Sequence, residues 1–381
     1  MACCAIIAAL AAMPSYGTTL NEALVSGQVK LDMRLRYETV DDSTNKDAKA
    51  GTLRTRLGYQ TGDYQGFFVF GEYEDVRAVA GLDDYAPEHS GYATVADPEV
   101  TQLNQALMGY RGISDTLIRL GRQRLILDNA RFVGNVGWRQ NEQTFEALSL
   151  VNTSLPHTTL SYAYLDEVKG ILEKFDANVS DHLLNASYSG FQALTVTAYA
   201  YLLEDDDSNA ENDSYGLRLK GGKGLAENTK LLYTAEFARQ STNDNDANYT
   251  FLEAGVQYRK VTAKLGYEVL GSDDGAYGFQ TPLATKHAFN GWADMFLSTP
   301  GDGLRDLMLS AGGKMAGIKL LAVYHDFSAD QGGDDYGSEI DLLAAKKFAK
   351  RYQLGIKYAS YRADNWKTDT DKLWLWGQLR L

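Results

Sequence analysis

The chain has 381 residues, a formal net charge of −13, and no run of roughly eighteen apolar residues beyond its N-terminal region. A protein that crosses a membrane with helices is therefore excluded, and the acidic balance argues against a nucleic-acid partner, because phosphate contacts need a basic face. Tyr (24) and Gly (36) are frequent and Pro (6) is rare, which is typical of strands that use nearly every backbone N–H in a ladder.

Residues 1–17 resemble a secretory signal peptide. A stretch of small apolar residues is followed by Ser15 and Gly17, which are suited to the −3 and −1 positions of a cleavage site. Both cysteines of the chain lie in this segment, so the mature chain, expected at 18–381, would contain none. An exported chain without disulfides needs another means of stabilisation, such as a closed sheet. A short buried helix is the alternative interpretation of the segment.

From Val29 onward the apolar residues recur with a period of two, which indicates β-strands rather than helices. Residues 29–38, 53–60 and 261–269 each place apolar side chains on one face and polar or small side chains on the other. A soluble β-sandwich also alternates in this way, so alternation alone does not identify the fold. Similar segments occur at 194–202, 215–219, 231–237, 252–258, 318–324 and 354–358.

Segment length and connection length separate the two folds. The segments are about ten residues long, which is the span of a tilted transmembrane strand. Short connections, such as 153–158, alternate with long and acidic ones, such as 78–100 and 271–303. Outer-membrane barrels have this pattern of short periplasmic turns and long extracellular loops. The sequence therefore predicts an all-β protein, a transmembrane antiparallel β-barrel of about 18 strands in the bacterial outer membrane.

The chain ends in an amphipathic strand. In residues 373–381 leucines and a glycine alternate with polar or aromatic residues, beginning with Trp374. The barrel-assembly machinery recognises strands of this kind at a chain end, although Leu381 stands here in place of the usual Phe. We therefore expect this machinery as a partner during biogenesis, and outer-membrane lipid and lipopolysaccharide as partners of the folded protein.

Arginines gather on the polar faces of two neighbouring strands. Arg34 and Arg36 share one such face, and Arg54 and Arg56 share the next. A barrel of about 18 strands encloses a lumen too wide for side chains to fill, so alternate residues line an aqueous interior. Since neighbouring strands lie ~4.8 Å apart, the four arginines should form one basic patch on the lumen wall.

Glu38, Glu72 and Glu74 fall near this patch, on polar-face or strand-end positions. Arginines that face carboxylates create a transverse field across a constriction, which favours polar or anionic solutes. In the alternative interpretation the charges pair with one another and only stiffen the wall. Residues 120–145 are rich in Arg, Gly and amide side chains and could fold inward as a loop that narrows the lumen. Residues 278–294 are aromatic enough to pack against another part of the chain.

These residues resemble the alginate-export porin family of Gram-negative bacteria. The resemblance is carried by residues 31–38, 53–58 and 121–123, and above all by residues 132–145. It implies an eighteen-stranded barrel with an arginine-rich, anion-selective constriction, in a family whose founding role is to pass the polyuronate alginate to the outside. Carried over by position, the lumen residues would be Arg34, Arg36, Arg54, Arg56, Arg122, Arg131 and Arg139.

One of these arginines conflicts with the alternation of its own strand. Ile118 and Leu120 place even-numbered positions outward, so Arg122 would need a β-bulge to turn inward.

The sequence thus predicts an outer-membrane channel for passive passage of polar or anionic small solutes or oligosaccharides. Dedicated export of an anionic polysaccharide such as alginate is the alternative, and a barrel-embedded hydrolase is a remote one. No enzyme activity, metal site or cofactor is expected, because no histidine shows a recognisable pairing with Ser and a carboxylate and no cluster has metal-ligand spacing. The histidines are His89, His157, His182, His287 and His325.

Overall fold

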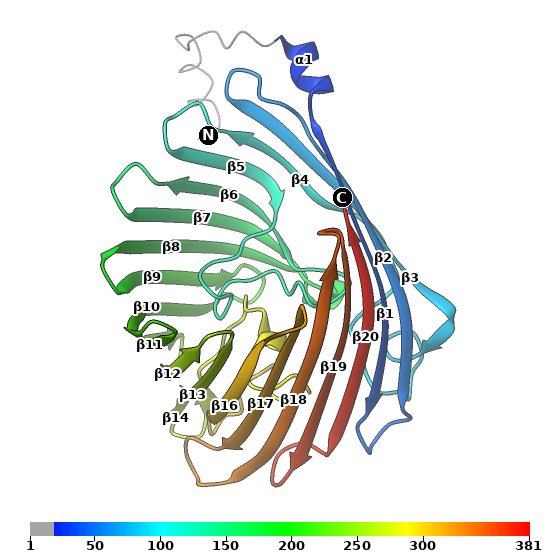
Figure 1. Cartoon of the computed structure of the whole chain (residues 1–381), viewed down its shortest axis with the longest axis vertical. Helices are drawn as coiled ribbons and strands as arrows, with labels where there is room; N and C mark the ends of the chain where they lie inside the picture. Colours follow the sequence, from blue (N-terminus) through cyan, green and yellow to red (C-terminus); the bar gives the residue numbers. More distant parts are fainter. Residues whose placement is uncertain (1–18) are drawn as a thin grey trace.

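The computed structural model describes residues 19–381, so the signal peptide predicted at 1–17 lies outside the described residues. Eighteen strands form one antiparallel sheet in which each barrel strand pairs with the next. The sheet closes because β20 (Thr370–Arg380) pairs with β1 (Gln28–Asp41) (Figure 1). The predicted antiparallel barrel is therefore confirmed, including its strand number.

Further elements do not belong to the barrel sheet. A hairpin of β14 (Ser272–Asp273) and β15 (Tyr277–Gly278) interrupts the connection from β13 to β16. The described helical segments are α1 (Leu20–Val25) and the 3-10 turns η2 (Glu173–Phe175) and η3 (Lys286–Ala288). Within residues 19–381, no helix is both long enough and apolar enough to cross a bilayer. The other barrel strands are β2 (Ala48–Gln60), β3 (Phe67–Asp84), β4 (Val100–Tyr110), β5 (Thr116–Gln123), β6 (Thr144–Asn152), β7 (Thr158–Lys169), β8 (Ala177–Phe191), β9 (Leu194–Asp205), β10 (Ala210–Ala226), β11 (Thr229–Thr242), β12 (Asp246–Tyr258), β13 (Val261–Leu270), β16 (Leu304–Met315), β17 (Ile318–Ser328), β18 (Asp335–Phe348) and β19 (Tyr352–Ala363).

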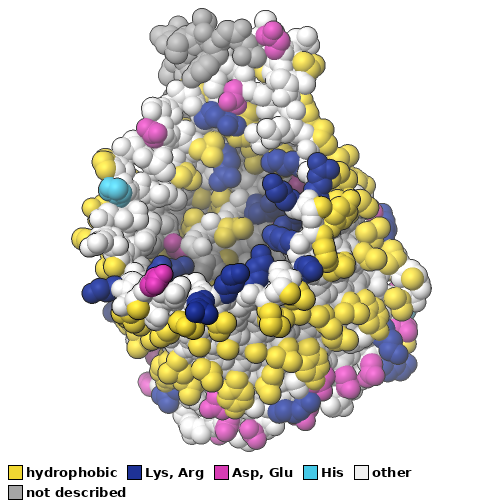
Figure 2. Space-filling model, viewed as in Figure 1, with side chains coloured by type: hydrophobic (Ala, Val, Ile, Leu, Met, Phe, Trp, Pro, Cys, Tyr) yellow, Lys and Arg dark blue, Asp and Glu magenta, His cyan; other side chains and the backbone are white. Residues whose placement is uncertain are grey.

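Successive side chains point to opposite sides of the wall, which sorts them by polarity. In β1, Leu35 is exposed on the outer face, whereas Arg34 and Arg36 are buried inside. In β20, Leu375 is exposed outside and Trp374 is buried inside. Figure 2 shows hydrophobic side chains gathered over the outer wall. A closed ladder with an apolar exterior leaves no unpaired strand edge and presents mainly apolar side chains to lipid.

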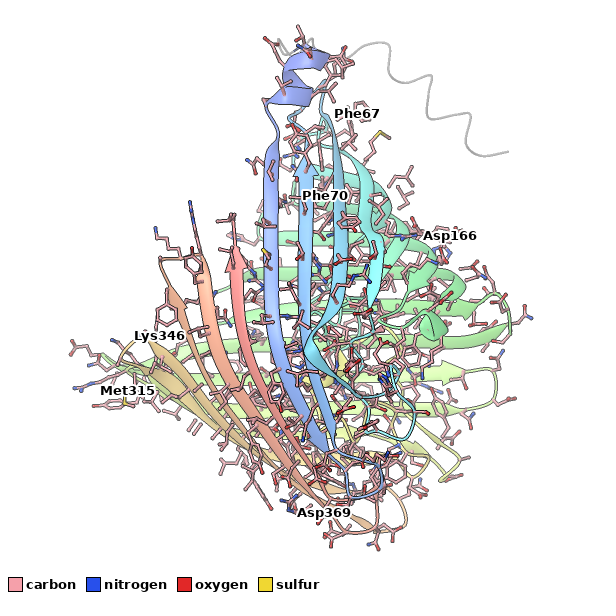
Figure 3. The ribbon with its side chains drawn as sticks, turned by 90° about the vertical axis from the view of Figure 1, so that its right-hand side faces the viewer. Phe67, Phe70, Asp166, Met315, Lys346 and Asp369 are labelled. Atoms are coloured by element: carbon pink, nitrogen blue, oxygen red, sulfur yellow. The ribbon has the colours of Figure 1, made fainter. Side chains whose placement is uncertain are left out.

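The two rims of the barrel differ in the length of their connections. The rim next to α1, here called the short rim, has tight turns such as 192–193 and 316–317. The opposite long rim carries 85–99, 124–143 and 271–303, so the predicted asymmetry is confirmed. Figure 3 shows β1, β2 and β3 running side by side between the rims, with Phe67 near α1 and Asp369 at the far end. The short rim comprises 61–66, 111–115, 153–157, 192–193, 227–228, 259–260, 316–317 and 349–351.

Two long-rim connections are shorter than the sequence indicates. The connections are residues 206–209 and 243–245, although the polar stretches of the sequence extend over 204–213 and 240–248. The strands on either side continue into these polar segments because backbone pairing does not depend on side-chain polarity. Pairing therefore extends beyond the amphipathic part of each strand.

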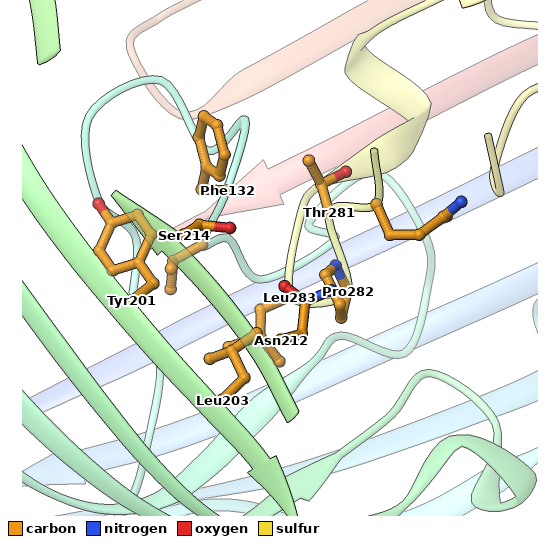
Figure 4. Close-up of a pocket in the computed structure, with 10 residues that line it drawn as sticks. Phe132, Tyr201, Leu203, Asn212, Ser214, Thr281, Pro282 and Leu283 are labelled. Atoms are coloured by element: carbon orange, nitrogen blue, oxygen red, sulfur yellow. The ribbon is translucent and has the colours of Figure 1, made fainter. Parts of the chain in front are cut away.

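Two long connections fold into the barrel. Inward folding was expected for the first, whereas the second was expected only to pack against another part of the chain. Loop A is residues 124–143 and loop B is residues 271–303. The rings of Phe132 (loop A), Phe279 (loop B) and Tyr249 (β12) lie 5.4–5.9 Å apart, centroid to centroid. A cavity of about 10 Å³ remains where the loops meet β9 and β10 (Figure 4), little more than one water position. The loops and this part of the wall therefore form a packed core.

Candidate functional site

The four arginines predicted to form a patch come together on the inner face of β1 and β2. They are here called the arginine wall: Arg34, Arg36, Arg54 and Arg56. Arg34 lies directly opposite Arg54 in the strand register, and Arg56 lies opposite Glu74 of β3. All four are at most 6% exposed. Arg34, Arg36 and Arg56 contact loop A, and Arg54 pairs with Asp32 of β1. The structure thus brings the four arginines together, in contact with protein rather than with open water.

Arg34 binds loop A through carbonyl groups. Its Nε donates to Oε1 of Gln140 at 2.8 Å, and its guanidinium also donates to the backbone carbonyls of Gly137 (3.3 Å) and Arg139. Gln140 in turn donates to the backbone and hydroxyl oxygens of Thr52 on β2. Within the described residues, Arg34 forms no salt bridge. Its positive charge is thus held by neutral acceptors alone, which makes it unlike the other members of the wall.

Arg36 and Glu38 connect the wall to two connections of the long rim. Arg36 pairs with Asp97, from the connection 85–99, and donates to the carbonyl of Trp138 in loop A at 2.6 Å. Glu38 lies 3.6 Å from Arg36 and accepts from Nη1 of Arg139 at 3.1 Å. Both residues are about 1% exposed. The predicted site residues Arg36, Glu38 and Arg139 therefore belong to one buried charge network.

Glu142 of loop A is a second centre of this network. Arg56 lies 3.1 Å from its carboxylate and also pairs with Glu74. Nε of Arg124 donates to Glu142 at 2.7 Å, and Asn104 donates to it at the same distance. Burial raises the pKa of Glu142, but Arg56, Arg124 and these hydrogen bonds outweigh it and lower the pKa to about 2. Glu142 is therefore a stable anion that holds loop A against β2 and β3.

Glu72 occupies the edge of the same network. Its Oε1 accepts hydrogen bonds from the amides of Asn104 (2.8 Å) and Gln105 (2.9 Å) on β4. Arg124 lies 3.7 Å from it. Glu72 and Glu74 thus face inward as predicted, but they lie on the same wall as the arginines and not across a gap from them.

Arg131 joins loop A to the opposite side of the barrel. Its guanidinium lies 2.9 Å from the carboxylate of Glu268 on β13 and donates to the side-chain carbonyl of Asn290 in loop B at 3.0 Å. It also lies over the ring of Phe289, 4.8 Å from the centroid. Arg131 is 3% exposed, so it stabilises the contact between the loops and does not line open space.

Asp294 of loop B accepts from three basic groups. Arg139 and Lys372 each donate at 2.9 Å, and Nδ1 of His287 lies at 2.6 Å. Nε2 of His287 lies 2.7 Å from Nζ of Lys357. Since a carboxylate only accepts and an ammonium only donates, the proton of a neutral imidazole must sit on Nδ1. Burial, reinforced by the charge of Lys357, lowers the pKa of His287 to about 3, whereas Asp294 opposes this shift.

Arg122 does not face the lumen, which corrects the expectation carried over by position. The pairings of β5 with β4 and β6 are in continuous register, so no bulge turns Arg122 inward. It lies on the same face as Leu120, which is 54% exposed, and its Nε donates to Glu146 at 2.7 Å. The alternation of the strand, and not the position within the family motif, determines where this side chain points.

Exposed basic residues line the part of the lumen near the short rim. Figure 2 shows Lys and Arg side chains around a hollow in the molecule. Alternation places them on the same inward face as the buried lumen residues of their strands. The inward carboxylate Asp32 is bonded to Arg54 (2.6 Å) and Arg380 (3.0 Å). The exposed, inward-facing basic residues near the short rim are here called the vestibule cations: Lys30, Lys220, Lys230, Lys314, Lys319, Lys347 and Arg380.

The sequence contained a signal for several inward residues that were not among the predicted site residues. Lys357 lies between the outward Ile356 and Tyr358, and Lys372 precedes the outward Leu373, so alternation places both inside. The vestibule cations follow from the same rule. Nothing in the strand pattern identifies Asp97, because it reaches the arginine wall from a loop.

The long rim carries the opposite charge. Asp and Glu outnumber Lys and Arg in its connections. Four of these connections contain acidic residues and no Lys or Arg, namely 85–99, 206–209, 243–245 and 329–334. In the part of the chain that the structure describes, no group of three or more His, Cys, Asp or Glu side chains is placed to hold a metal ion.

Known proteins of the same architecture are outer-membrane porins. Pseudomonas aeruginosa OccK9 (OpdG) superposes with a TM-score of 0.76 at 16% identity, over 94% of this chain and 100% of that chain. P. aeruginosa OpdK, solved with vanillate, gives 0.74 at 15% identity over 94% and 99%. Acinetobacter baumannii OccAB4 gives 0.73 at 13% identity over 93% and 98%. At this level of identity the likeness shows the fold.

A search of curated protein sequences finds no match to this chain. The family model for alginate export matches residues 26–268, which is more than half of the chain. The chain therefore belongs to the alginate-export family and forms a β-barrel channel in the bacterial outer membrane.

Proposed function

We propose that this channel passes polar and anionic small solutes or oligosaccharides passively, and that the vestibule cations set its preference for anions. The observation that carries the proposal is the set of exposed, inward-facing Lys and Arg side chains around the hollow in Figure 2. Rings of basic side chains in a water-filled passage attract anions and raise their local concentration. The inward carboxylate Asp32 neutralises Arg380, but among the described contacts the other six vestibule cations form no salt bridge, so their field is not cancelled.

The arginines of loop A and of the arginine wall have a different part in this proposal. Arg36, Arg56, Arg131 and Arg139 are buried in salt bridges, so their charges are largely neutralised by their partners. They hold the loops in place and thereby determine how wide the passage is. Anions would meet these arginines only when the loops move.

The channel can be tested by measuring reversal potentials in planar bilayers with asymmetric KCl. Lys314 and Lys319 lie directly opposite each other on β16 and β17, so the double substitution Lys314→Gln/Lys319→Gln removes two adjacent inward charges. We expect anion preference in the parent protein and a weaker preference in the double variant. Lys346→Gln is the matched control, because Lys346 lies on the outward face of β18 beside the inward Lys347. Cation selectivity of the parent protein would contradict the proposal.

Outward passage of an anionic polysaccharide is the second candidate. The family match supports it, and so does the charge difference between the rims, with cations at the short rim and carboxylates at the long rim. This arrangement favours entry of a polyanion from the short-rim side. Short uronate oligomers should then block the current at lower concentration when added to that side, whereas equal block from both sides would argue for a passive channel of general use.

We assign no catalytic step to this chain. The two buried histidines, His287 and His325, hydrogen-bond Asp294 and Asp306. Among residues 19–381, no Ser hydroxyl completes a triad with either histidine.

A further inference from the structure

Helix α1 is held against the outside of the barrel at the short rim. The hydroxyl of Tyr59 donates to the carbonyl of Leu24 at 2.6 Å and accepts from the backbone N–H of Gly27 at 3.1 Å. The backbone N–H of Gly62, in the turn from β2 to β3, donates to the carbonyl of Ala23 at 2.8 Å. Because Tyr59 lies on the outward face of β2 together with the exposed Leu57, the helix is joined to the lipid side of the wall.

The helix has a defined start and a defined apolar surface. Thr19 and Glu22 form a reciprocal capping box that fixes the first turn. Ala23 is buried against the rim, whereas Leu20 and Leu24, one turn apart, are 55% and 51% exposed. Val25, at the end of the helix, is 73% exposed. Three exposed aliphatic side chains in a six-residue helix form an apolar surface that no described part of the chain covers.

The level of the helix relative to the bilayer follows from aromatic residues. Tyr59 is one of several exposed aromatic side chains on the outward faces of strands near the short rim. In outer-membrane barrels such side chains form a girdle at the level of the lipid headgroups, where their amphipathic rings are stable. The other members are Tyr188, Tyr258, Phe348 and Tyr352.

We propose that α1 is an interfacial anchor whose apolar side chains Leu20, Leu24 and Val25 insert into the periplasmic leaflet of the outer membrane. Lipid is indicated as the partner of this apolar surface because the surface is continuous with the outer wall of the barrel. Val29 at the start of β1 is 66% exposed and Leu57 is 52% exposed on the outer wall, so the apolar surface of α1 extends the lipid-facing surface of the barrel. A short amphipathic helix at headgroup level gains free energy by burying its apolar face there.

The anchor has a structural consequence for the channel. Helix α1 is bonded to β2 through Tyr59 and to the β2–β3 turn through Gly62. These strands carry part of the arginine wall and Glu74, on which loop A rests. Lipid contact at α1 therefore supports the short-rim end of the strands that position the loops.

The test uses the full chain in lipid vesicles, with Cys3 and Cys4 replaced by Ala. Leu24→Cys carries an environment-sensitive fluorophore. Ser26→Cys is the matched control, because Ser26 is exposed and lies two residues after Leu24, on the opposite side of the helix. We expect the label at position 24 to be blue-shifted and quenched by a lipid-borne quencher, and the label at position 26 to be quenched by aqueous iodide. Heat-modifiable mobility on gels verifies that both variants are folded barrels.

Equal aqueous quenching at positions 26 and 24 would overturn the proposal. So would a label at position 24 that is exposed to water in vesicles but shielded in native outer membranes, because a protein would then cover the helix. Leu20→Glu/Leu24→Glu provides a second measurement, with Ser26→Glu as its control. The double variant should lower the midpoint of thermal unfolding in vesicles while Ser26→Glu does not, and equal midpoints would count against lipid insertion.

Discussion

Asp294 of loop B and Arg139 of loop A are joined by a buried salt bridge of 2.9 Å inside the barrel. Lys372 of β20 donates to the same carboxylate oxygen at 2.9 Å. The carboxylate of Asp294 thus connects loops A and B to β20, the strand that closes the sheet. Arg139 retains Glu38 as a second partner, whereas the described contacts give Lys372 no other carboxylate.

Asp294→Asn should loosen the two loops. The substitution leaves Lys372 as an uncompensated buried charge, and breaking a buried pair in this way costs about 3–5 kcal/mol. We expect larger single-channel conductance and more frequent conductance fluctuations, measured in planar bilayers. Asp302→Asn is the control, because Asp302 is an exposed residue of the same loop. Unchanged conductance in a correctly folded Asp294→Asn channel would show that this contact does not restrict the passage.

Glu142 should make the position of loop A sensitive to strong acid. Its pKa is lowered to about 2 in the folded protein from a usual value of 4.5, so its stabilising effect is complete above about pH 4.5 and is lost as the pH falls towards 2. Glu142→Gln should abolish the part of the conductance change that occurs in this range. A variant with the same acid dependence as the parent would assign that dependence to other carboxylates.

His287 should make the channel sensitive to milder acid than Glu142 does. Its pKa falls from 6.5 to about 3 on folding, chiefly through burial. Because the unfolded chain then binds a proton more readily, stability declines as the pH drops below about 6.5 and continues to decline towards 3. The charged groups around the ring are Asp294, Lys357 and Arg139.

His287→Gln removes this titration, so the midpoint of thermal unfolding should fall less between about pH 6.5 and 4.5 in the variant than in the parent. Unfolding midpoints measured in lipid vesicles from pH 7 to pH 3.5 check the prediction. An equal fall of the midpoint above pH 4.5 in His287→Gln and in the parent would exclude this imidazole as its source.

Arg122→Gln should leave ion selectivity unchanged. Arg122 faces outward and pairs with Glu146 on the outer wall, so its loss leaves the charges of the lumen unchanged. Reversal potentials of the variant and the parent should agree within error, in contrast to Lys314→Gln/Lys319→Gln. A clear shift for Arg122→Gln would place this side chain in the ion path.

Strand pairing explains why the barrel and the arginine wall could be predicted. The alternation of apolar and polar residues within β1 and within β2 shows which side chains of each strand face inward. Because β1 and β2 are consecutive strands that pair with each other, Arg34 and Arg54 become neighbours. The alternation of side chains in β5 also indicated that Arg122 points outward, whereas its position in the family motif implied that it lines the lumen.

The partners of the arginines could not be predicted in the same way. Arg36 meets Asp97, and Arg131 meets Glu268, across long stretches of sequence and through loops with no regular period. Composition indicated that loop A folds inward and that loop B packs against another part of the chain, but their contacts depend on the three-dimensional path of each loop. For this reason the predicted wall was expected to face water, whereas the structure shows it covered by protein.

The pairing of β1 with β20 also bears on how the molecule is made. The first barrel strand carries Arg34 and Arg36, and the eleven residues of β20 supply both its missing neighbour and Lys372. During biogenesis the edge next to these arginines stays unpaired until the end of the chain arrives. Completion of the cylinder and docking of its internal loops are therefore coupled events, so a chain truncated before β20 would lose both together.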